Sequence, residues 1–424
     1  MKFRCAPATM LTGLPRQVAP VALFEQPTRA SMGSAGTAVV GACRRLRLDP
    51  DRRAWEFLSV ALGVVAADFG YERRGSSDGW TRELEVEIAV ADPMFWNSQA
   101  QALNRLLGFL TGDIWTLSFT EGGAVPAAPQ RVSARPEGAV TLLSGGLDSL
   151  IGTLDRVAAG LDLVAVSQVS AGDKAQQRAF AGGIGAGLFH VQLNHNARPP
   201  GAGERSQRSR SIVFIAFGIL AATALDRYKS GDEVTLFVPE NGFISLNVPL
   251  TPARLGSLST RTTHPFYMAQ LQAVLRSAGL RVTLQNPYQF KTKGEMMSEC
   301  RSQALLQQYA AGATSCGRFA RNGFQHCGRC LPCLIRRAAF RKWGRRDTTG
   351  YVYTDLSRKD SAHRNFIDVR AAGIAVETVN RFGADKWAAG ALSAAQLGSV
   401  LPYLHVASRG IEELEDFLKA ARAL

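Results

Sequence analysis

The sequence has no apolar run long enough to cross a membrane. Its longest apolar stretch extends from about Ile212 to Leu225, short of the ~18 residues that a membrane-spanning helix needs. No unbroken apolar stretch accompanies the basic residues of positions 1–35, so we predict no signal peptide. Internal repeats and heptads are missing too, which argues against a repeat array or a coiled coil. We therefore expect a cytoplasmic protein with no membrane partner.

Cysteine and acidic residues are also scarce. Seven cysteines in 424 residues of a cytoplasmic chain are more often metal ligands or core residues than disulfides. Asp and Glu total 35 against 49 Lys and Arg, so the formal net charge is +14. A nucleic acid, the phosphates of a small ligand or an acidic protein would each explain this charge. Nucleic acid is thus allowed as a partner but not required.

What is present is typical of a folded globular protein, with 46% hydrophobic and 20% charged residues. At about 150 residues per domain, the length predicts two or three domains. Changes in texture divide the sequence into six parts. These are an irregular arm at 1–35, an α+β module at 36–120, a Gly/Pro-rich linker at 121–137, an α/β domain at 138–312, a cysteine motif at 313–340 and a helical region at 341–424.

The module at 36–120 has clear periodicity. Apolar residues at helical spacing predict helices over 54–67 and 98–110, and strict alternation predicts half-buried strands over 84–90 and 114–119. Four of the six tryptophans fall here, and we interpret them as core residues, with a partner-binding face as the alternative. They are Trp55, Trp80, Trp96 and Trp115.

In the α/β domain, strands and helices alternate. Short apolar runs predict strands over 139–143, 161–169, 189–193, 234–238 and 281–284. The almost wholly apolar segment Ser209–Leu225 predicts a buried helix, and a further helix is expected over 266–277. Such alternation predicts a doubly wound parallel sheet with helices on both faces. Beyond it, we expect helices over 388–401 and 411–424.

The first of these strands runs directly into a glycine turn and a helix. The turn reads Ser144-Gly145-Gly146-Leu147-Asp148-Ser149. Adjacent glycines allow the backbone to bring its N–H groups close to an anion, the serines add hydroxyl donors, and the helix start is electropositive. The turn therefore predicts a pyrophosphate-binding loop, although an ordinary strand–turn–helix is the alternative. It is not a Walker A loop, because no Gly-Lys-Ser/Thr follows. Asp148 would repel a phosphate directly, so we expect it to hold Mg²⁺ or to shape the loop.

Four cysteines fall within eighteen residues. They are Cys316, Cys327, Cys330 and Cys333. The spacing C-x10-C-x2-C-x2-C suits one tetrahedral Zn²⁺ held by four thiolates, with no open coordination position, so we expect a structural site. An iron–sulfur cluster is the competing interpretation, since four cysteines also hold clusters. His326 adjoins Cys327, but four cysteines already complete the shell.

The turn resembles the signature of the PP-loop ATP pyrophosphatases. The resemblance implies a Rossmann-like doubly wound sheet, with the loop after its first strand, and cleavage of ATP between the α and β phosphates to adenylate a carboxyl or carbonyl oxygen. Together with the four cysteines and Thr292-Lys293-Gly294-Glu295, it is similar to 7-cyano-7-deazaguanine synthase. That family uses ATP to activate 7-carboxy-7-deazaguanine, which ammonia then attacks. The similarity covers roughly 138–340.

Five further residues are candidates for the site. Arg210 and Lys293 open predicted helices where the family places phosphate and substrate contacts, so with Asp148 they are our candidate catalytic residues. The candidate ATP-binding residues are Ser144, Gly145, Gly146, Leu147, Asp148 and Ser149. Glu240 and Asn241 follow the strand at 234–238 and are candidates for reading a base edge, with an ordinary turn as the alternative. His264 is a candidate base near the incoming amine, although a His before Pro is more often a loop residue.

The sequence also departs from the synthase pattern. The family's Tyr-Gly-Gln and Tyr-Pro-Asp-Cys-Arg stretches are absent, and its Arg-Asn pair reads Arg210-Ser211. These changes leave adenylation intact and place the ammonia step in doubt. Over its whole length the chain looks more like the QueC-like synthases of bacterial anti-phage operons, such as the C component of the Qat system. That resemblance implies transfer of a deazaguanine acyl group to an amine on a partner protein from the same operon.

Three other functions stay open at this point. They are the synthase of deazapurine biosynthesis, a PP-loop RNA-modifying enzyme and a non-catalytic nucleotide-binding scaffold. The RNA enzyme fits the charge, but no cysteine pair for sulfur transfer exists outside the zinc set. The scaffold would have no need for both serines and the aspartate of the loop.

Overall fold

The computed structural model describes the whole chain except residues 171, 202, 205–207, 251–260, 358, 360–364 and 394–398. Its strands form two five-stranded sheets, and every strand pair is parallel. The first sheet has the order β3 (Gly33–Ala35), β2 (Val18–Leu23), β1 (Lys2–Ala6), β4 (Glu83–Ala89) and β5 (Ile114–Thr120). The second has the order β10 (Val282–Gln285), β9 (Val234–Phe237), β6 (Ala139–Leu142), β7 (Leu163–Gln168) and β8 (Phe189–Leu193). The predicted α/β class and the parallel sheet of the second half are confirmed.

The expected irregular arm at 1–35 is wrong. These residues contribute β1, β2 and β3, and β1 lies at the centre of the first sheet between β2 and β4. The strands have only three to six residues and are joined by turns and a 3₁₀ segment (Ala8–Met10) rather than by α-helices. No helical periodicity therefore marks the crossovers that parallel strands normally use. The α+β module at 36–120 is in consequence part of a parallel α/β unit that begins at residue 2.

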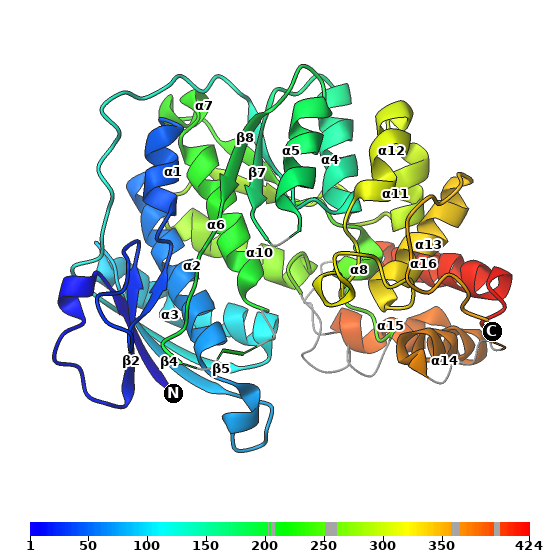
Figure 1. Cartoon of the computed structure of the whole chain (residues 1–424), viewed down its shortest axis with the longest axis horizontal. Helices are drawn as coiled ribbons and strands as arrows, with labels where there is room; N and C mark the ends of the chain where they lie inside the picture. The colour runs from blue at the N-terminus through cyan, green and yellow to red at the C-terminus, as the bar shows by residue number, and fades with distance from the viewer. Residues whose placement is uncertain are drawn as a thin grey trace.

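Helices from both sheets pack back to back between them (Figure 1). From the first sheet come α2 (Arg52–Gly70) and α3 (Pro93–Thr111), and from the second come α6 (Arg210–Thr223) and α10 (Pro265–Ser277). The contacts pair α2 with α6 and α3 with α10, and one hydrophobic core extends through all four helices. Trp55, Trp96 and Trp115 are buried in this core, as predicted, whereas Trp80 is half-buried.

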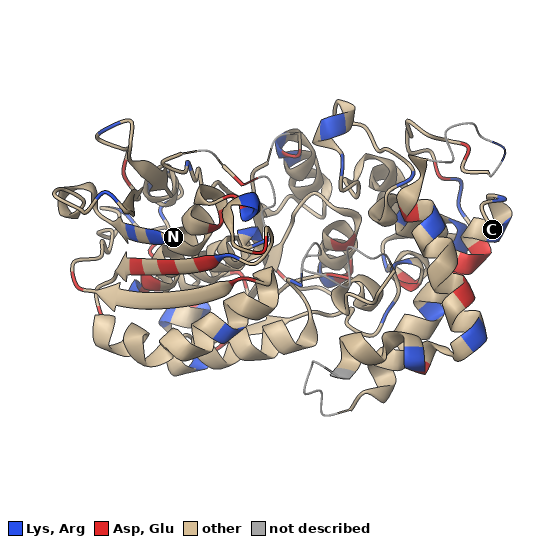
Figure 2. Ribbon diagram, turned by 90° about the horizontal axis from the view of Figure 1, so that it is seen from below, with Lys and Arg blue, Asp and Glu red and all other residues tan. Residues whose placement is uncertain are grey.

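The other face of the first sheet is exposed to solvent along β4 and β5, whereas β2 and β3 are almost wholly buried. Residues of β4 and β5 alternate between buried and exposed, as their sequence predicts. The outward residues of β4 are acidic (Figure 2), and two pair with bases on β1, namely Glu85 with Lys2 at 2.8 Å and Glu87 with Arg4 at 2.9 Å. A parallel sheet is normally covered on both faces, so this half-solvated sheet is unusual.

The second sheet is covered on its other face as well. In Figure 1, β7 and β8 lie between α6 on one side and α4 (Leu147–Ala158) with α5 (Lys174–Gly183) on the other. The linker region 121–137 contains no helix or strand. Of the short helices, α1 (Val39–Arg45) precedes this linker, and α7 (Asp226–Lys229) and α8 (Gly242–Ser245) follow it.

The last third of the described chain is helical. Its helices are α11 (Lys293–Glu299), α12 (Gln303–Tyr309), α13 (Leu331–Trp343), α14 (Ile367–Phe382), α15 (Ala384–Ser393) and α16 (Leu401–Ala420). Here α13 and α16 share a second apolar core with α8, α14 and α15. The helix expected over 388–401 falls partly on residues 394–398, outside the described residues. Throughout the described ranges, no helix is both long and apolar enough to cross a membrane.

Candidate functional site

The predicted loop follows β6 and leads into α4, with Gly146 as the helix N-cap. Gly145 has a φ of 93°, a left-handed conformation that favours glycine. The two serines close the turn: the Ser144 N–H donates to Ser149 Oγ at 3.1 Å, and the two hydroxyl oxygens lie 3.0 Å apart. The turn thus holds its serines and the start of α4 on one concave surface.

This loop lies where the strand order reverses. Because β6 is paired with β7 on one side and β9 on the other, connections after these strands depart in opposite directions. Residues from elsewhere fix the loop: Gln177 Nε2 donates to the Ser144 carbonyl at 3.0 Å, and the Thr314 N–H donates to the Gly145 carbonyl at 2.9 Å. Open parallel sheets bind ligands at such a reversal.

Asp148 in the first turn of α4 is paired with Lys293. Lys293 Nζ lies 2.5 Å from Asp148 Oδ1, and Asn241 Nδ2 donates to Asp148 Oδ2 at 2.8 Å. Burial by itself would raise the pKa of Asp148, but the Lys293 charge and hydrogen bonds with Glu240, Lys293 and Asn241 outweigh it and lower that pKa to about 2. Asp148 is therefore an anion at neutral pH. It forms a buried ion pair with Lys293, which is only 8% exposed.

Two cavities meet at the loop. The larger, of about 410 Å³, has apolar walls from Leu142, Phe214 and Val238 and a polar wall that includes Arg210 and Glu240. The smaller, of about 260 Å³, contains Asp148 and Lys293. Residues of the loop and its surroundings line both cavities, namely Ser144, Gly146, Ser149, Pro239, Glu240 and Thr314. A ligand longer than one cavity would therefore have to cross the loop.

Two residues predicted to bind substrate cap helices instead. Asn241 is fully buried and caps α8, since its Oδ1 accepts the Ile244 N–H at 3.0 Å while its amide nitrogen holds Asp148. His264 is buried, caps α10 through the Phe266 N–H at 3.3 Å and lines neither cavity at the loop. Burial lowers the pKa of His264 to about 4, so its ring is neutral. The structure thus brings Glu240 and Arg210 to the loop, but not His264.

The carboxyl-terminal helix α16 supports Lys293 from behind. Thr292 begins α11 with a capping box, in which its hydroxyl accepts the Glu295 N–H at 3.1 Å and Glu295 accepts the Thr292 N–H at 2.9 Å. From α16, Arg409 pairs with Glu295 at 2.5 Å, and Glu413 accepts the Thr292 hydroxyl at 2.5 Å. The helix that places Lys293 is therefore fixed by the last helix of the chain.

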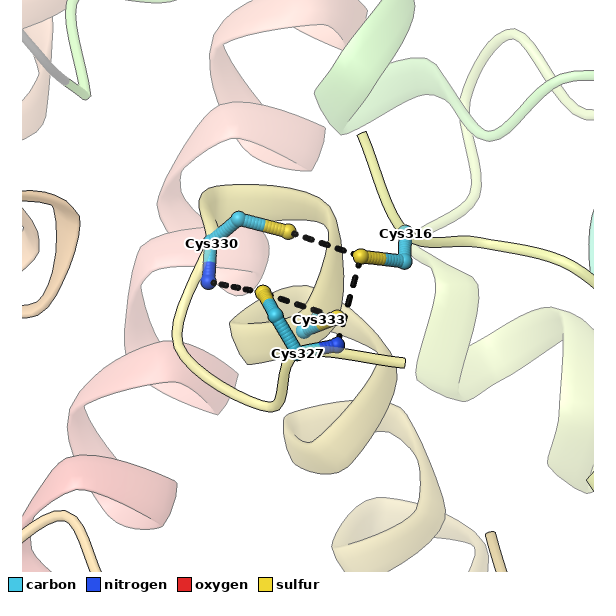
Figure 3. A group of neighbouring side chains, drawn as sticks. All are labelled: Cys316, Cys327, Cys330 and Cys333. Carbon is cyan, nitrogen blue, oxygen red and sulfur yellow. Dashed lines mark hydrogen bonds between the residues drawn. The ribbon is translucent and has the colours of Figure 1, made fainter. Parts of the chain in front are cut away.

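The four predicted cysteines converge (Figure 3). Their sulfur atoms all lie within 4.8 Å of one another, with Cys316 and Cys330 3.8 Å apart and Cys327 and Cys333 4.0 Å apart. The edge of a tetrahedron of sulfurs ~2.3 Å from a central Zn²⁺ is about 3.8 Å, so this cluster could hold a metal ion such as zinc. Backbone N–H groups also donate to sulfur, as Cys327 does to Cys316 at 3.3 Å, which favours thiolates. His326 is not among the four; its Nε2 accepts the Ser315 N–H at 3.2 Å.

The cysteine cluster and the loop are joined by one short segment. Cys316 lies two residues after Thr314, whose backbone N–H donates to the Gly145 carbonyl. Arg336 on α13, fully buried, donates to the Ala313 carbonyl at 2.7 Å and to the Ala310 carbonyl at 2.5 Å. A metal in the cluster would therefore fix the segment that rests on the loop.

Some residues of the site escaped the sequence-based prediction. Gln168, Ser170, Asp173, Arg208 and Ser211 line the larger cavity. The position of Gln168 at the end of β7 could have identified it, because β7 adjoins the strand that carries the loop. Arg208 is 2% exposed, although arginines are mostly found on the surface of proteins.

Comparison with known proteins identifies no relative: no protein-family model, no curated protein and no solved structure matches the chain. Its function has to be inferred from the geometry of the loop, the two cavities and the cysteine cluster.

Proposed function

We propose that the chain is an ATP-dependent enzyme that adenylates a carboxylate, releases pyrophosphate and passes the acyl group to an amine on a partner protein. One observation carries the proposal: the Asp148–Lys293 pair stands at the start of α4, beside a Gly-Gly loop where two cavities meet. The strand order of the second sheet is that of doubly wound nucleotide-binding domains, which supports a Rossmann-like PP-loop domain over 138–312.

In this proposal, the phosphates of ATP lie on the loop. The backbone N–H groups at the start of α4 and the Ser144 and Ser149 hydroxyls donate to phosphate oxygens. A carboxylate oxygen of the substrate attacks the α-phosphorus, the bond to the bridging oxygen breaks, and pyrophosphate leaves with the electron pair. Lys293 neutralises charge on the leaving phosphates, and Arg210 does so from the larger cavity. Lysine and arginine in a partly desolvated site are suited to that role.

Two carboxylates fit a divalent cation here. Asp148 is ionised and lines the smaller cavity, and Glu240 lines both cavities. Carboxylate oxygens together with substrate phosphates are the ligands that Mg²⁺ prefers. Asp148 and Glu240 are the residues that would hold it, and the ion would offset phosphate charge. The four cysteines would hold a structural Zn²⁺, since four thiolates leave no open position.

The substrate is the least constrained part of the proposal. The apolar walls of the larger cavity suit a flat ring, and Glu240 on its polar wall suits the donor edge of a purine-like base. We therefore propose 7-carboxy-7-deazaguanine, or a related base, as the carboxylate that is activated. Any amine held against the resulting mixed anhydride can complete the transfer by proximity.

The test measures AMP and intact protein masses after incubation with ATP, Mg²⁺ and 7-carboxy-7-deazaguanine, with and without proteins of the same operon. We expect AMP and a base-sized mass gain on a partner. Lys293→Met should lower the rate of AMP formation at least about 100-fold, because it removes the charge facing the phosphates. The matched control is Lys291→Met, two residues away and exposed, which should leave the rate unchanged.

The outcomes separate the alternatives. AMP with a free nitrile and no protein adduct would assign the chain to deazapurine biosynthesis instead. No AMP under any of these conditions would overturn the adenylation proposal.

A further inference from the structure

The larger cavity collects buried polar atoms that lack a hydrogen-bond partner. Within the described chain, five such atoms belong to residues that line it: Arg208 Nε and Nη2, Gln168 Nε2, Ser211 Oγ and Asp173 Oδ1. More than nine in ten buried polar groups in proteins are hydrogen-bonded, because leaving one unpaired costs about 1–3 kcal/mol. Five of them belong to residues around one cavity, where a ligand or ordered water would supply the missing partners.

Arg208 is the centre of this group, and the first sheet holds it in place. Its Nη1 donates to the carbonyl of Thr111, at the end of α3, at 2.6 Å. Its guanidinium carbon lies 5.1 Å from the centre of the Trp80 ring. One nitrogen is fixed in this way, whereas Nε and Nη2 have no hydrogen-bond partner. Arg208 is also one of the residues that line the larger cavity.

The backbone beside Arg208 is fixed by a buried charge network. Asp68 on α2 accepts the Ser209 N–H at 3.0 Å and the Ser209 hydroxyl at 2.6 Å, and it is itself paired with Arg82. Arg82 and Arg73 both donate to Asp113 at 2.7 Å. Elements of the first sheet thereby position a side chain in a cavity of the second.

Arg208 has no anionic partner in this arrangement. Among the described residues, no carboxylate lies within ion-pair distance of it, although it is only 2% exposed. Burial, and then the neighbouring charge of Arg73, lowers the pKa of Arg208 to about 10 against the opposing effect of the more distant Asp113 and Asp68, which still leaves Arg208 charged at neutral pH. A buried positive charge is stable only when it is paired.

We propose that Arg208, Gln168 and Ser211 form a subsite that binds an oxyanion, either a carboxylate or a phosphate group, of the ligand in the larger cavity. The proposal deepens the proposed function and rests on its premise that a substrate enters this cavity beside the loop. Arg208 offers two parallel N–H donors, the geometry that suits two oxygens of one group. Asp173 Oδ1 accepts an N–H of the same ligand. Residues packed on the first sheet would then position the site without lining the cavity.

The test is equilibrium binding to the full chain, which requires no turnover. Three probes are titrated separately by calorimetry: α,β-methylene ATP, 7-carboxy-7-deazaguanine and guanine, which lacks the carboxylate. The variants are Arg208→Gln, Ser211→Ala and Gln168→Ala. The matched control is Arg281→Gln, because Arg281 also donates to a backbone carbonyl, that of Tyr228 at 2.8 Å, and lies over an aromatic ring, but is outside the cavity.

Losing a charge-assisted pair should weaken binding of one oxyanion probe about 10- to 100-fold in Arg208→Gln. If only 7-carboxy-7-deazaguanine binds more weakly, the subsite binds the carboxylate of the acyl substrate. If only α,β-methylene ATP binds more weakly, the subsite binds a phosphate. Either result supports the subsite. The guanine affinity and the Arg281→Gln affinities should not change. These affinities do not depend on AMP formation. A protein that binds the probes at this subsite but forms no AMP would contradict the proposed function and leave the subsite standing.

A purely structural Arg208 would give a different result. It would lower the thermal midpoint of the free protein and leave the ligand-induced shift of that midpoint intact. Should Arg208→Gln not fold, Ser211→Ala and Gln168→Ala decide, since neither bonds to the first sheet, and each should weaken binding a few-fold. Unchanged affinities for all probes in these variants would overturn the proposal.

Discussion

The two sheets of the molecule share one strand order but differ at the ends of their strands. In both, the order along the sheet is third, second, first, fourth and fifth in the sequence of that sheet. At the carboxyl ends of the first sheet, a small apolar cluster that includes Ala6, Leu11 and Met32 fills the space. At the carboxyl ends of the second lie a Gly-Gly loop, two cavities and unpaired polar atoms. The strand order alone therefore does not make a site; the residues of the connections do.

The charges of the first sheet lie at the opposite end of its strands. Arg82 directly precedes β4, Asp113 directly precedes β5, and the two are paired with each other. Apart from Arg73 Nε, the polar atoms of Arg73, Arg82, Asp68 and Asp113 have partners. The charged groups of this network are therefore almost fully paired with one another, whereas several polar atoms of residues around the larger cavity have no partner.

Breaking the network should produce the largest effect on stability. In Asp113→Ala, two buried guanidiniums lose their shared carboxylate, so we expect the free energy of unfolding to fall by about 3–5 kcal/mol. Urea unfolding monitored by tryptophan fluorescence measures it. The control is Glu85→Ala in the same sheet, where an exposed pair with Lys2 contributes about 0–1 kcal/mol. Equal effects of the two substitutions would contradict a difference between network and surface pair.

A smaller effect distinguishes the two carboxyl ends of the sheets. Gly145 and Gly13 both have left-handed backbones, with φ of 93° and 69°, and alanine at either costs about 1–2 kcal/mol of local strain. A Cβ at Gly145 would meet Gln177 at 3.4 Å, whereas at Gly13 it would meet open space. We expect Gly145→Ala to weaken binding of α,β-methylene ATP about tenfold and Gly13→Ala to leave it unchanged. Calorimetric titration of both variants checks this, and a loss in both would show that the loop has no special role.

The sequence predicts the second sheet, its glycine turn and the cysteine cluster better than it predicts the first sheet. The hexapeptide loop and the cysteine spacing are local, so Ser144 and Cys316 could be assigned from short stretches of residues. The strands of 1–35 could not, because no helical crossover separates them. Asn241 and His264 were expected to bind substrate, but Asn241 caps α8 and donates to Asp148, and His264 caps α10. Arg208 depends on a carbonyl 97 residues away, a contact that only the packing of the two sheets creates.

The last contrast concerns the helix that supports Lys293, whose contribution to stability has the opposite pH dependence to that of the network. Burial, foremost, raises the pKa of Glu413 from its ordinary 4.5 to about 7; Glu295 on α11 adds to this, while Thr292, the Gly294 N–H and Lys342 on α13 oppose it. Between these values the folded chain binds more protons than the unfolded chain, so this contribution to stability declines as pH rises from 4.5 to 7. For Asp113 the pKa is lowered by Arg82 and Arg73 against the effect of burial, so its contribution is lost as pH falls instead.

Unfolding in urea across pH 5–7.5 should therefore show a steeper decline for the wild-type protein than for Glu413→Gln, which keeps an acceptor for the Thr292 hydroxyl but does not titrate. The control is Glu412→Gln, an exposed neighbour on α16 that accepts the Ser408 hydroxyl at 3.0 Å and should keep the wild-type slope. If Glu413→Gln also keeps that slope, Glu413 is ionised at no cost in the folded chain. The buried carboxylates beside the site would then be as fully compensated as those of the first sheet, and the contrast between the two regions would be confined to the larger cavity.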